Sequence, residues 1–163
     1  MSFQDISNTL WRQRNLLEML MFKLEEEQLI LAAGRTRWIG PATREVEQVL
    51  DEIKTTEVMR AMQVDAVAPT LGLPANPSLR QLVDAAPEPW SALFDEHRRA
   101  FLGLTEEVVA VSKANKDLLA RGAAAARDML AAVSSSDERH GPYDAAGSVR
   151  TSNRGGLLVD RSL

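Results

Sequence analysis

The first 33 residues carry leucines at a strict heptad spacing. Leucine recurs at every seventh position: Leu10, Leu17, Leu24 and Leu31. No Gly or Pro interrupts residues 5–33, so the spacing predicts one continuous α-helix that packs along a stripe. Further apolar residues widen this stripe, which indicates a helix that contacts two neighbours, or one neighbour and a bound partner.

A second long helix is predicted for residues 41–71. Gly34 supplies a stop for the first helix, and residues 38–41, Trp-Ile-Gly-Pro, are expected to form the corner between the two. Apolar residues then alternate at spacings of four and three. Pro69 predicts a kinked or unwound end, because proline inside a helix costs about 3 kcal/mol.

Polar residues interrupt both apolar stripes. Gln13 and Glu27 stand at stripe positions of the first helix, and Glu57 and Arg60 stand in phase in the second. The first stripe is therefore expected to pack against uneven neighbours, unlike an ideal zipper, and the second to wander around its helix.

The next part of the chain is expected to form a short helix and then the longest one. Ser78 can cap a short helix over residues 79–85. Residues 89–133 keep the four-three rhythm at twelve positions: Trp90, Phe94, His97, Phe101, Leu104, Val108, Val111, Asn115, Leu118, Gly122, Ala125 and Met129. These positions change from large to small residues, so the last third admits a close neighbour but buries little by itself.

The pattern stops after Val133. Residues 134–163 are rich in Ser, Gly, Asp, Arg and Asn, which predicts a disordered tail. The tail ends on a short apolar patch: Leu157, Leu158, Val159 and Leu163. The predicted fold class is all-α, with a helical bundle over residues 1–133 and the tail behind it.

Composition and charge exclude several classes of protein. The 163 residues fit one domain, and a net charge of −4 with scattered basic residues provides no surface for nucleic acid. The chain has no cysteine, which excludes disulfides and thiolate sites and favours a reducing cytosol. Neither a signal-peptide pattern nor a run of about 18 apolar residues occurs, so Sec secretion and a membrane span are not expected.

No residue pattern indicates catalysis or a metal site. The two histidines, His97 in a helix stripe and His140 in the tail, cannot build a histidine site, and His97 is interpreted as a packing residue. The consecutive glutamates at 25–27 point about 100° apart on a helix and are interpreted as a solvated face. Phosphate-binding and nucleophile motifs are absent. The chain is therefore predicted to be no enzyme and to need no metal and no cofactor.

Asn115 has two interpretations that the sequence leaves open. A lone asparagine on an apolar stripe fixes the register or the number of packed helices, at some cost in stability. Alternatively, Asn115 lies at an exposed end of the stripe.

Three segments of the chain resemble the FlgN family of flagellar export chaperones, above all its actinobacterial branch. They are LWRQRNLLEMLMFKLEEEQLILAAGRTRW, LGLPANPSLRQLVDAAPEPW and EVVAVSKANKDLLARG, and the resemblance covers residues 5–133. It implies a cytoplasmic bundle of three long antiparallel helices that binds hook-filament junction proteins. It also implies that the chain prevents self-association of these clients' helical termini and delivers them to the flagellar type III export apparatus.

The resemblance places client binding toward the end of the last helix, where the family's N-x-x-L-L pattern matches Asn115, Leu118 and Leu119. The residue pattern agrees, since apolar residues at this end have little chain left to cover them. The candidate client-binding residues are Asn115, Leu118, Leu119, Met129, Leu130 and Val133. We expect a client helix to dock there as an amphipathic helix in an apolar groove. The alanines at 123–126 depart from the family pattern, and the terminal apolar patch is a hypothetical second contact with the export apparatus.

Two other functions compete with this interpretation. Trp38, Ile39 and Gly40 form a W-x-G triplet between two predicted helices, as in helical hairpin substrates of type VII secretion systems. Those proteins carry a Y-x-x-x-D/E signal, whereas Tyr143 here is followed four residues later by Gly147. A structural coiled-coil adaptor without an export role is the other alternative, although the interrupted stripes argue against a permanent zipper.

Overall fold

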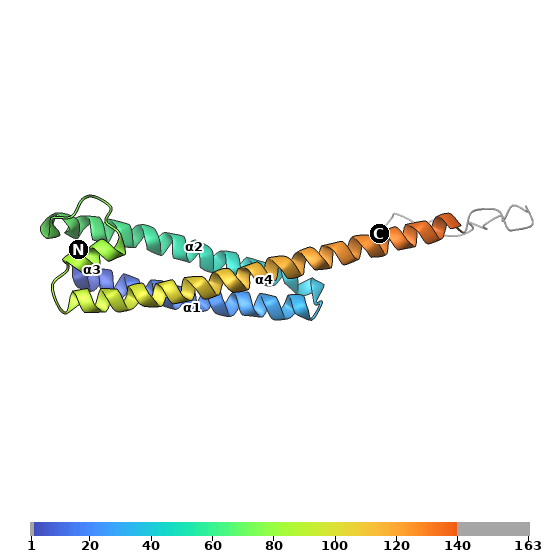
Figure 1. The fold of residues 1–163 in the computed structure, drawn as a ribbon, viewed down its shortest axis with the longest axis horizontal. Helices are drawn as coiled ribbons and strands as arrows, with labels where there is room; N and C mark the ends of the chain where they lie inside the picture. The colour runs from blue at the N-terminus through green and yellow to red at the C-terminus, as the bar shows by residue number, and fades with distance from the viewer. Residues whose placement is uncertain (1, 140–163) are drawn as a thin grey trace, which may run out of the picture. The chain divides into compact units, whose positions relative to one another are not determined.

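Long α-helices account for most of the chain in the computed structural model, which describes residues 2–139 (Figure 1). The elements are α1 (Phe3–Ala32), α2 (Thr36–Val67), the 3₁₀-helix η1 (Ala68–Leu71), α3 (Leu79–Ala85) and α4 (Trp90–Arg139). The chain divides into two compact units, residues 1–120 and residues 121–163. In the first unit, α2 runs antiparallel to α1 and to the start of α4 (Figure 1). The predicted all-α bundle of three long helices with a short connecting helix is confirmed.

The turn between α1 and α2 lies earlier than predicted. Gly34 takes a left-handed backbone conformation (φ 64°) and follows the end of α1, as expected, but α2 already begins at Thr36. The predicted corner at residues 38–41 is therefore wrong, because these residues belong to the first turns of α2 and Pro41 lies inside the helix. The left-handed Gly34 reverses the chain, and α2 continues through Pro41 although its nitrogen cannot donate a helical hydrogen bond.

This correction bears on the type VII alternative. The triplet Trp38, Ile39 and Gly40 lies within α2 and not in a turn between helices. The likeness to type VII hairpin substrates loses the feature on which it depended.

The remaining boundaries follow local rules of helix termination. α2 ends at Val67 and passes into η1, which contains Pro69, so the expected unwinding at this proline is confirmed. The Ser78 side chain caps α3 by accepting a hydrogen bond from the Gln81 backbone N–H, 3.2 Å away. α4 continues past its predicted end at Val133 to Arg139. From residue 140 onward the predicted disordered tail lies outside the described residues.

Two apolar clusters hold the first unit together. The first apolar cluster joins α1, α2, α3 and α4 through Ile6, Leu10, Val64, Val67, Leu82 and Phe94. The second apolar cluster contains Leu20, Leu24, Val46 and Val49, with Val108 and Val111 of α4 packed against it. Each methylene removed from water in these clusters contributes about 0.8 kcal/mol to folding. The two clusters are separate along the bundle, and polar residues occupy the stretch between them.

His97 lies on α4 between Phe94 and Phe101 of the first apolar cluster and is fully buried. Its ring makes a T-shaped contact with the ring of Trp11, with the ring centres 4.7 Å apart, and stacks on the ring of Phe101 at 6.1 Å. Neither ring nitrogen has a hydrogen-bond partner among the described residues. Burial disfavours the charged imidazolium and lowers the pKa of His97, with a smaller opposing effect of Glu96. The interpretation of His97 as a packing residue is confirmed.

Burial of neutral His97 predicts that the protein loses stability as the pH falls through the ordinary histidine pKa. Below this pH the histidine binds a proton in the unfolded chain but not in the folded chain. This difference lowers the free energy of unfolding by at most about 1.4 kcal/mol per pH unit. Urea unfolding at pH 7.5 and pH 5.5, followed by circular dichroism, measures the loss. We expect His97→Gln to remove it and His140→Gln to leave it in place.

The acidic groups with a lowered pKa titrate below this window. A hydrogen bond from the Ser2 backbone lowers the pKa of Asp5, and one from Lys23 lowers the pKa of Glu45. Their contribution to stability is present above the ordinary carboxyl pKa and is lost only at lower pH. If the stability of the His97→Gln variant fell between pH 7.5 and pH 5.5 by as much as that of the wild-type protein, the prediction for His97 would be contradicted.

Candidate functional site

Asn115 binds α4 to α1 inside the bundle. Its side chain is 2% exposed, and its amide Nδ2 donates hydrogen bonds to the Leu24 carbonyl (2.9 Å) and to Glu27 Oε1 (3.1 Å). The second carboxylate oxygen of Glu27 accepts a hydrogen bond from Thr43 Oγ1 of α2, 3.2 Å away. Asn115, Glu27 and Thr43 form a polar cluster, the register cluster, that connects all three long helices.

The register cluster decides between the two interpretations of Asn115. Its amide reaches α1 only when this turn of α4 stands beside Leu24 and Glu27, so one alignment of the helices satisfies the hydrogen bonds. Asn115 therefore fixes register and does not lie at an exposed end of the stripe. As a candidate client-binding residue it is placed in the interior, where it positions α4 and does not face solvent.

Glu27 is an interior residue that the sequence interpretation placed on the surface. The solvated-face interpretation of the three glutamates is wrong for Glu27, which is 7% exposed, whereas Glu25 is exposed. The available signal was its position in the heptad stripe, where a charged residue needs a buried partner. Thr43 carried no such signal, because its role depends on the angle at which α2 returns past α1.

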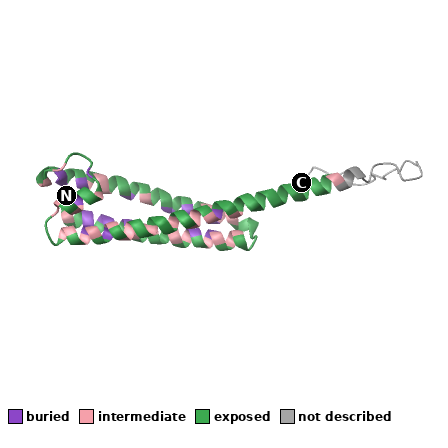
Figure 2. Ribbon diagram, viewed as in Figure 1, coloured by how far each residue is buried: buried purple, intermediate pink, exposed green. Residues whose placement is uncertain are grey.

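Asn115 is the last buried residue among those whose burial is described. In the first unit, Leu118 is half-buried and Leu119 is exposed. In the second unit, every residue from 121 to 134 is exposed (Figure 2). This stretch is nevertheless helical, which fits its content of alanine, leucine, methionine and arginine, all strong helix formers.

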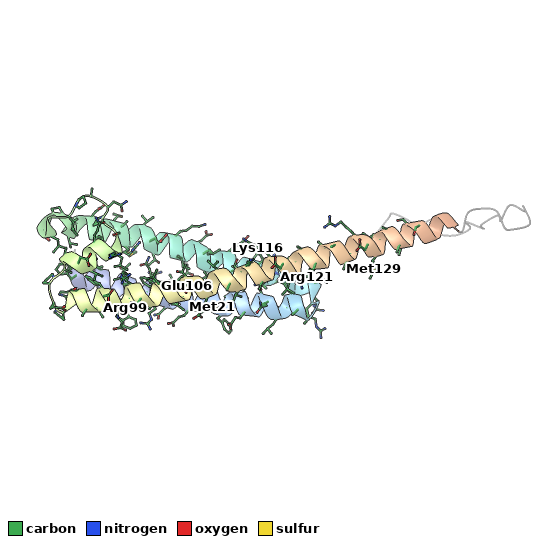
Figure 3. The ribbon with its side chains drawn as sticks, viewed as in Figure 1. Met21, Arg99, Glu106, Lys116, Arg121 and Met129 are labelled. Carbon is green, nitrogen blue, oxygen red and sulfur yellow. The ribbon has the colours of Figure 1, made fainter. Side chains whose placement is uncertain are left out.

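The second unit carries an apolar helix face that contains three of the predicted client-binding residues. We call it the α4 apolar face; at spacings of three and four it consists of Gly122, Ala123, Ala126, Met129, Leu130 and Val133. Met129 is labelled in Figure 3, and Met129, Leu130 and Val133 are all exposed. Arg121 and Asp128 fall on the other side of the helix by the same spacing. This part of α4 is therefore an amphipathic helix, with the α4 apolar face on one side and charged residues on the other.

Several large apolar residues of α1 are also exposed. They include Trp11, Met19, Phe22 and Leu29. The two aromatic side chains, Trp11 and Phe22, each make a cation–π contact. The Arg14 guanidinium lies 5.3 Å from the Trp11 ring centre, and Lys23 Nζ lies 5.4 Å from the Phe22 ring centre. These contacts distinguish the α1 surface from the α4 apolar face, which is built from glycine, alanine and aliphatic residues.

Over residues 2–139, no three histidine, aspartate or glutamate side chains converge in a way that could hold a metal ion. Within the same range, no helix combines the length and apolarity needed to cross a bilayer.

The comparisons with known proteins give one match. The family model described as FlgN protein matches residues 1–151 of the chain. No curated protein and no solved structure matches it.

The register cluster predicts that Asn115→Ala destabilises the bundle by about 1–3 kcal/mol, because the Glu27 carboxylate and the Leu24 carbonyl lose a buried donor. Urea unfolding gives the free energy. The matched control is Asn15→Ala, the same change at an exposed position of α1, which should stay within about 0.5 kcal/mol of wild type. Equal effects at the two positions would show that the buried hydrogen bonds contribute nothing.

Proposed function

The chain belongs to the FlgN family of flagellar export chaperones, and from this premise we propose that it holds a helix of a hook-filament junction protein on the α4 apolar face. The client stays bound in the cytoplasm until it is passed to the type III export apparatus. The role is one of binding, without catalysis. The observation that carries the proposal is a helical run of apolar side chains, all exposed, after the last buried residue of α4.

The geometry of the α4 apolar face suits a helical client. Its large residues, Met129, Leu130 and Val133, follow one another at spacings of one, three and four, so an amphipathic partner helix can pack along them. Gly122 and the alanines lack bulky side chains and allow the partner backbone to approach closely. Met129 adds an unbranched, adaptable side chain, which tolerates clients of different sequence.

The same composition limits how tightly a client is held. Burial of apolar surface contributes about 25 cal/mol per Å², and ordering of the client offsets part of it. Alanine and glycine bury little area, so most of the gain comes from Met129, Leu130 and Val133. We expect a reversible complex, which fits a chaperone that must release its client to the export apparatus.

Leu118 and Leu119 remain candidates for a separate contact. They belong to the first unit, one half-buried and the other exposed. The proposed contact of the terminal apolar patch with the export apparatus concerns residues outside the described range.

Charge placed on the α4 apolar face should weaken client capture. Met129→Asp combined with Leu130→Asp puts two carboxylates where apolar surface is buried, and we expect at least about a tenfold weaker complex. Co-purification of the tagged chain with hook-filament junction proteins of its own organism, followed by calorimetry, measures the effect. Leu118→Asp combined with Leu119→Asp tests the separate contact in the same assay.

The matched control places the same charges on the other side of the helix. Ala124→Asp combined with Ala131→Asp lies off the α4 apolar face by helical spacing, so the control should bind as the wild type does. Circular dichroism shows whether each variant remains helical. Full binding by the Met129 and Leu130 variant would refute the proposed site, and failure of the wild-type chain to capture any junction protein would refute the proposed function.

A further inference from the structure

The α4 apolar face places small side chains next to large exposed ones. Gly122, Ala123 and Ala126 come first along the helix, and Met129 and Leu130 follow, 71% and 68% exposed. Among the described residues, the space beside Gly122 is open, and a side chain from elsewhere can enter it. Large apolar side chains in contact with water are unfavourable. This surface therefore suits a segment that brings bulky aliphatic side chains of its own.

The sequence that follows the described residues contains such a segment. The terminal apolar patch brings Leu157, Leu158 and Val159 together, and Leu163 follows four residues after Val159. Residues 140–156, which connect the patch to α4, contain no leucine, isoleucine or methionine. The patch is therefore the first group of bulky aliphatic side chains that the chain offers after the α4 apolar face.

We propose that the terminal apolar patch packs onto the α4 apolar face of its own chain and covers it until a client binds. Its leucines then lie over the small residues of the face and against Met129 and Leu130. The contact removes aliphatic surface of both segments from water, which is the interaction that favours it. It differs from the contact expected between this patch and the export apparatus, because it needs no second protein.

The length of chain between the two segments favours this contact. Residues 140–156 are 17 residues long. A segment of this length spans about 60 Å when fully extended and about 23 Å on average as a random coil. Along the helix, Leu130 lies about 14 Å before Arg139, where the description of α4 ends. A connection whose average span is close to the required distance gives an effective concentration in the millimolar range, so even a weak contact forms.

A second copy of the chain is a weaker candidate for the occupant. If two α4 apolar faces met, the small residues Gly122, Ala123 and Ala126 would contribute little buried area on either side. A second copy also lacks the covalent connection, so it competes with the patch only when the protein itself is in the millimolar range.

The consequence of the contact is regulation of the proposed client site, and this part rests on the proposed function. A client must displace the patch, so its affinity is reduced by the fraction of chains whose α4 apolar face is uncovered. The contact itself forms without a client and can be tested without one.

A single spin label tests the contact, since the chain has no cysteine of its own. Ser162→Cys in the full chain is coupled to a nitroxide, and the methyl groups of methionine and leucine are followed by NMR in the absence of any client. We expect the oxidised label to broaden the methyl signals of Met129 and Leu130 more than that of Leu29, an exposed leucine of α1.

Two variants of the labelled chain separate docking from mere proximity. Leu157→Ser, Leu158→Ser and Val159→Ser together remove the apolar patch and keep the length of the chain, so most of the broadening should be lost. The matched control changes three apolar residues of the connecting segment to serine, and it should keep the broadening; these residues are Ala145, Ala146 and Val149.

Three outcomes would overturn the proposal. Equal broadening in the variant without the patch would show that the label is near α4 only because the chain connects them. Stronger broadening at Leu29 than at Leu130 would place the patch on another surface. Broadening of an isotope-labelled chain by a separate spin-labelled chain would identify a second copy as the partner of the patch. Because no client is present, a failure of client capture would leave this result unchanged.

Discussion

The two hydrogen bonds from Asn115 to α1 determine which part of α4 is inside the bundle. Its amide reaches the Leu24 carbonyl and the Glu27 carboxylate, and Thr43 connects the same carboxylate to α2. A slip of α4 by one turn would break these bonds and leave Glu27 Oε1 buried without the donor that Asn115 supplies, which is costly. The register cluster thus fixes where the covered part of α4 ends, and no residue beyond Asn115 is buried among those described.

Polar residues recur in the interior of this bundle. The register cluster lies at one level, Gln13 and Arg60 lie at another, between the two apolar clusters, and His97 lies among the aromatic residues of the first apolar cluster. An apolar replacement of such residues is often neutral or stabilising, so their presence points to roles other than stability. For the register cluster that role is alignment of the helices.

The sequence predicted the fold because its apolar spacing is regular. The heptad leucines of α1 and the four-three rhythm of α4 depend only on helical geometry, and nine of the twelve predicted positions of α4, Trp90 to Leu118, are buried or half-buried. The corner at residues 38–41 was misplaced because Gly34 alone completes the reversal, and a proline can lie inside a helix when its neighbours pack well. Glycine and proline locate turns only when the surrounding contacts agree.

The candidate site could be predicted in part. The exposure of Met129 and Leu130 was foreseeable, since little apolar sequence follows them, whereas the burial of Glu27 and its bond to Thr43 depend on tertiary contacts between distant segments. The central claim is that the α4 apolar face contacts the client. Site-specific photo-crosslinking tests it most directly, with a benzophenone amino acid at Leu130, which is 68% exposed, or at Leu29 of α1, which is 71% exposed. The account predicts crosslinks to a hook-filament junction protein from position 130 and none from position 29. Crosslinks from position 29 alone would contradict it.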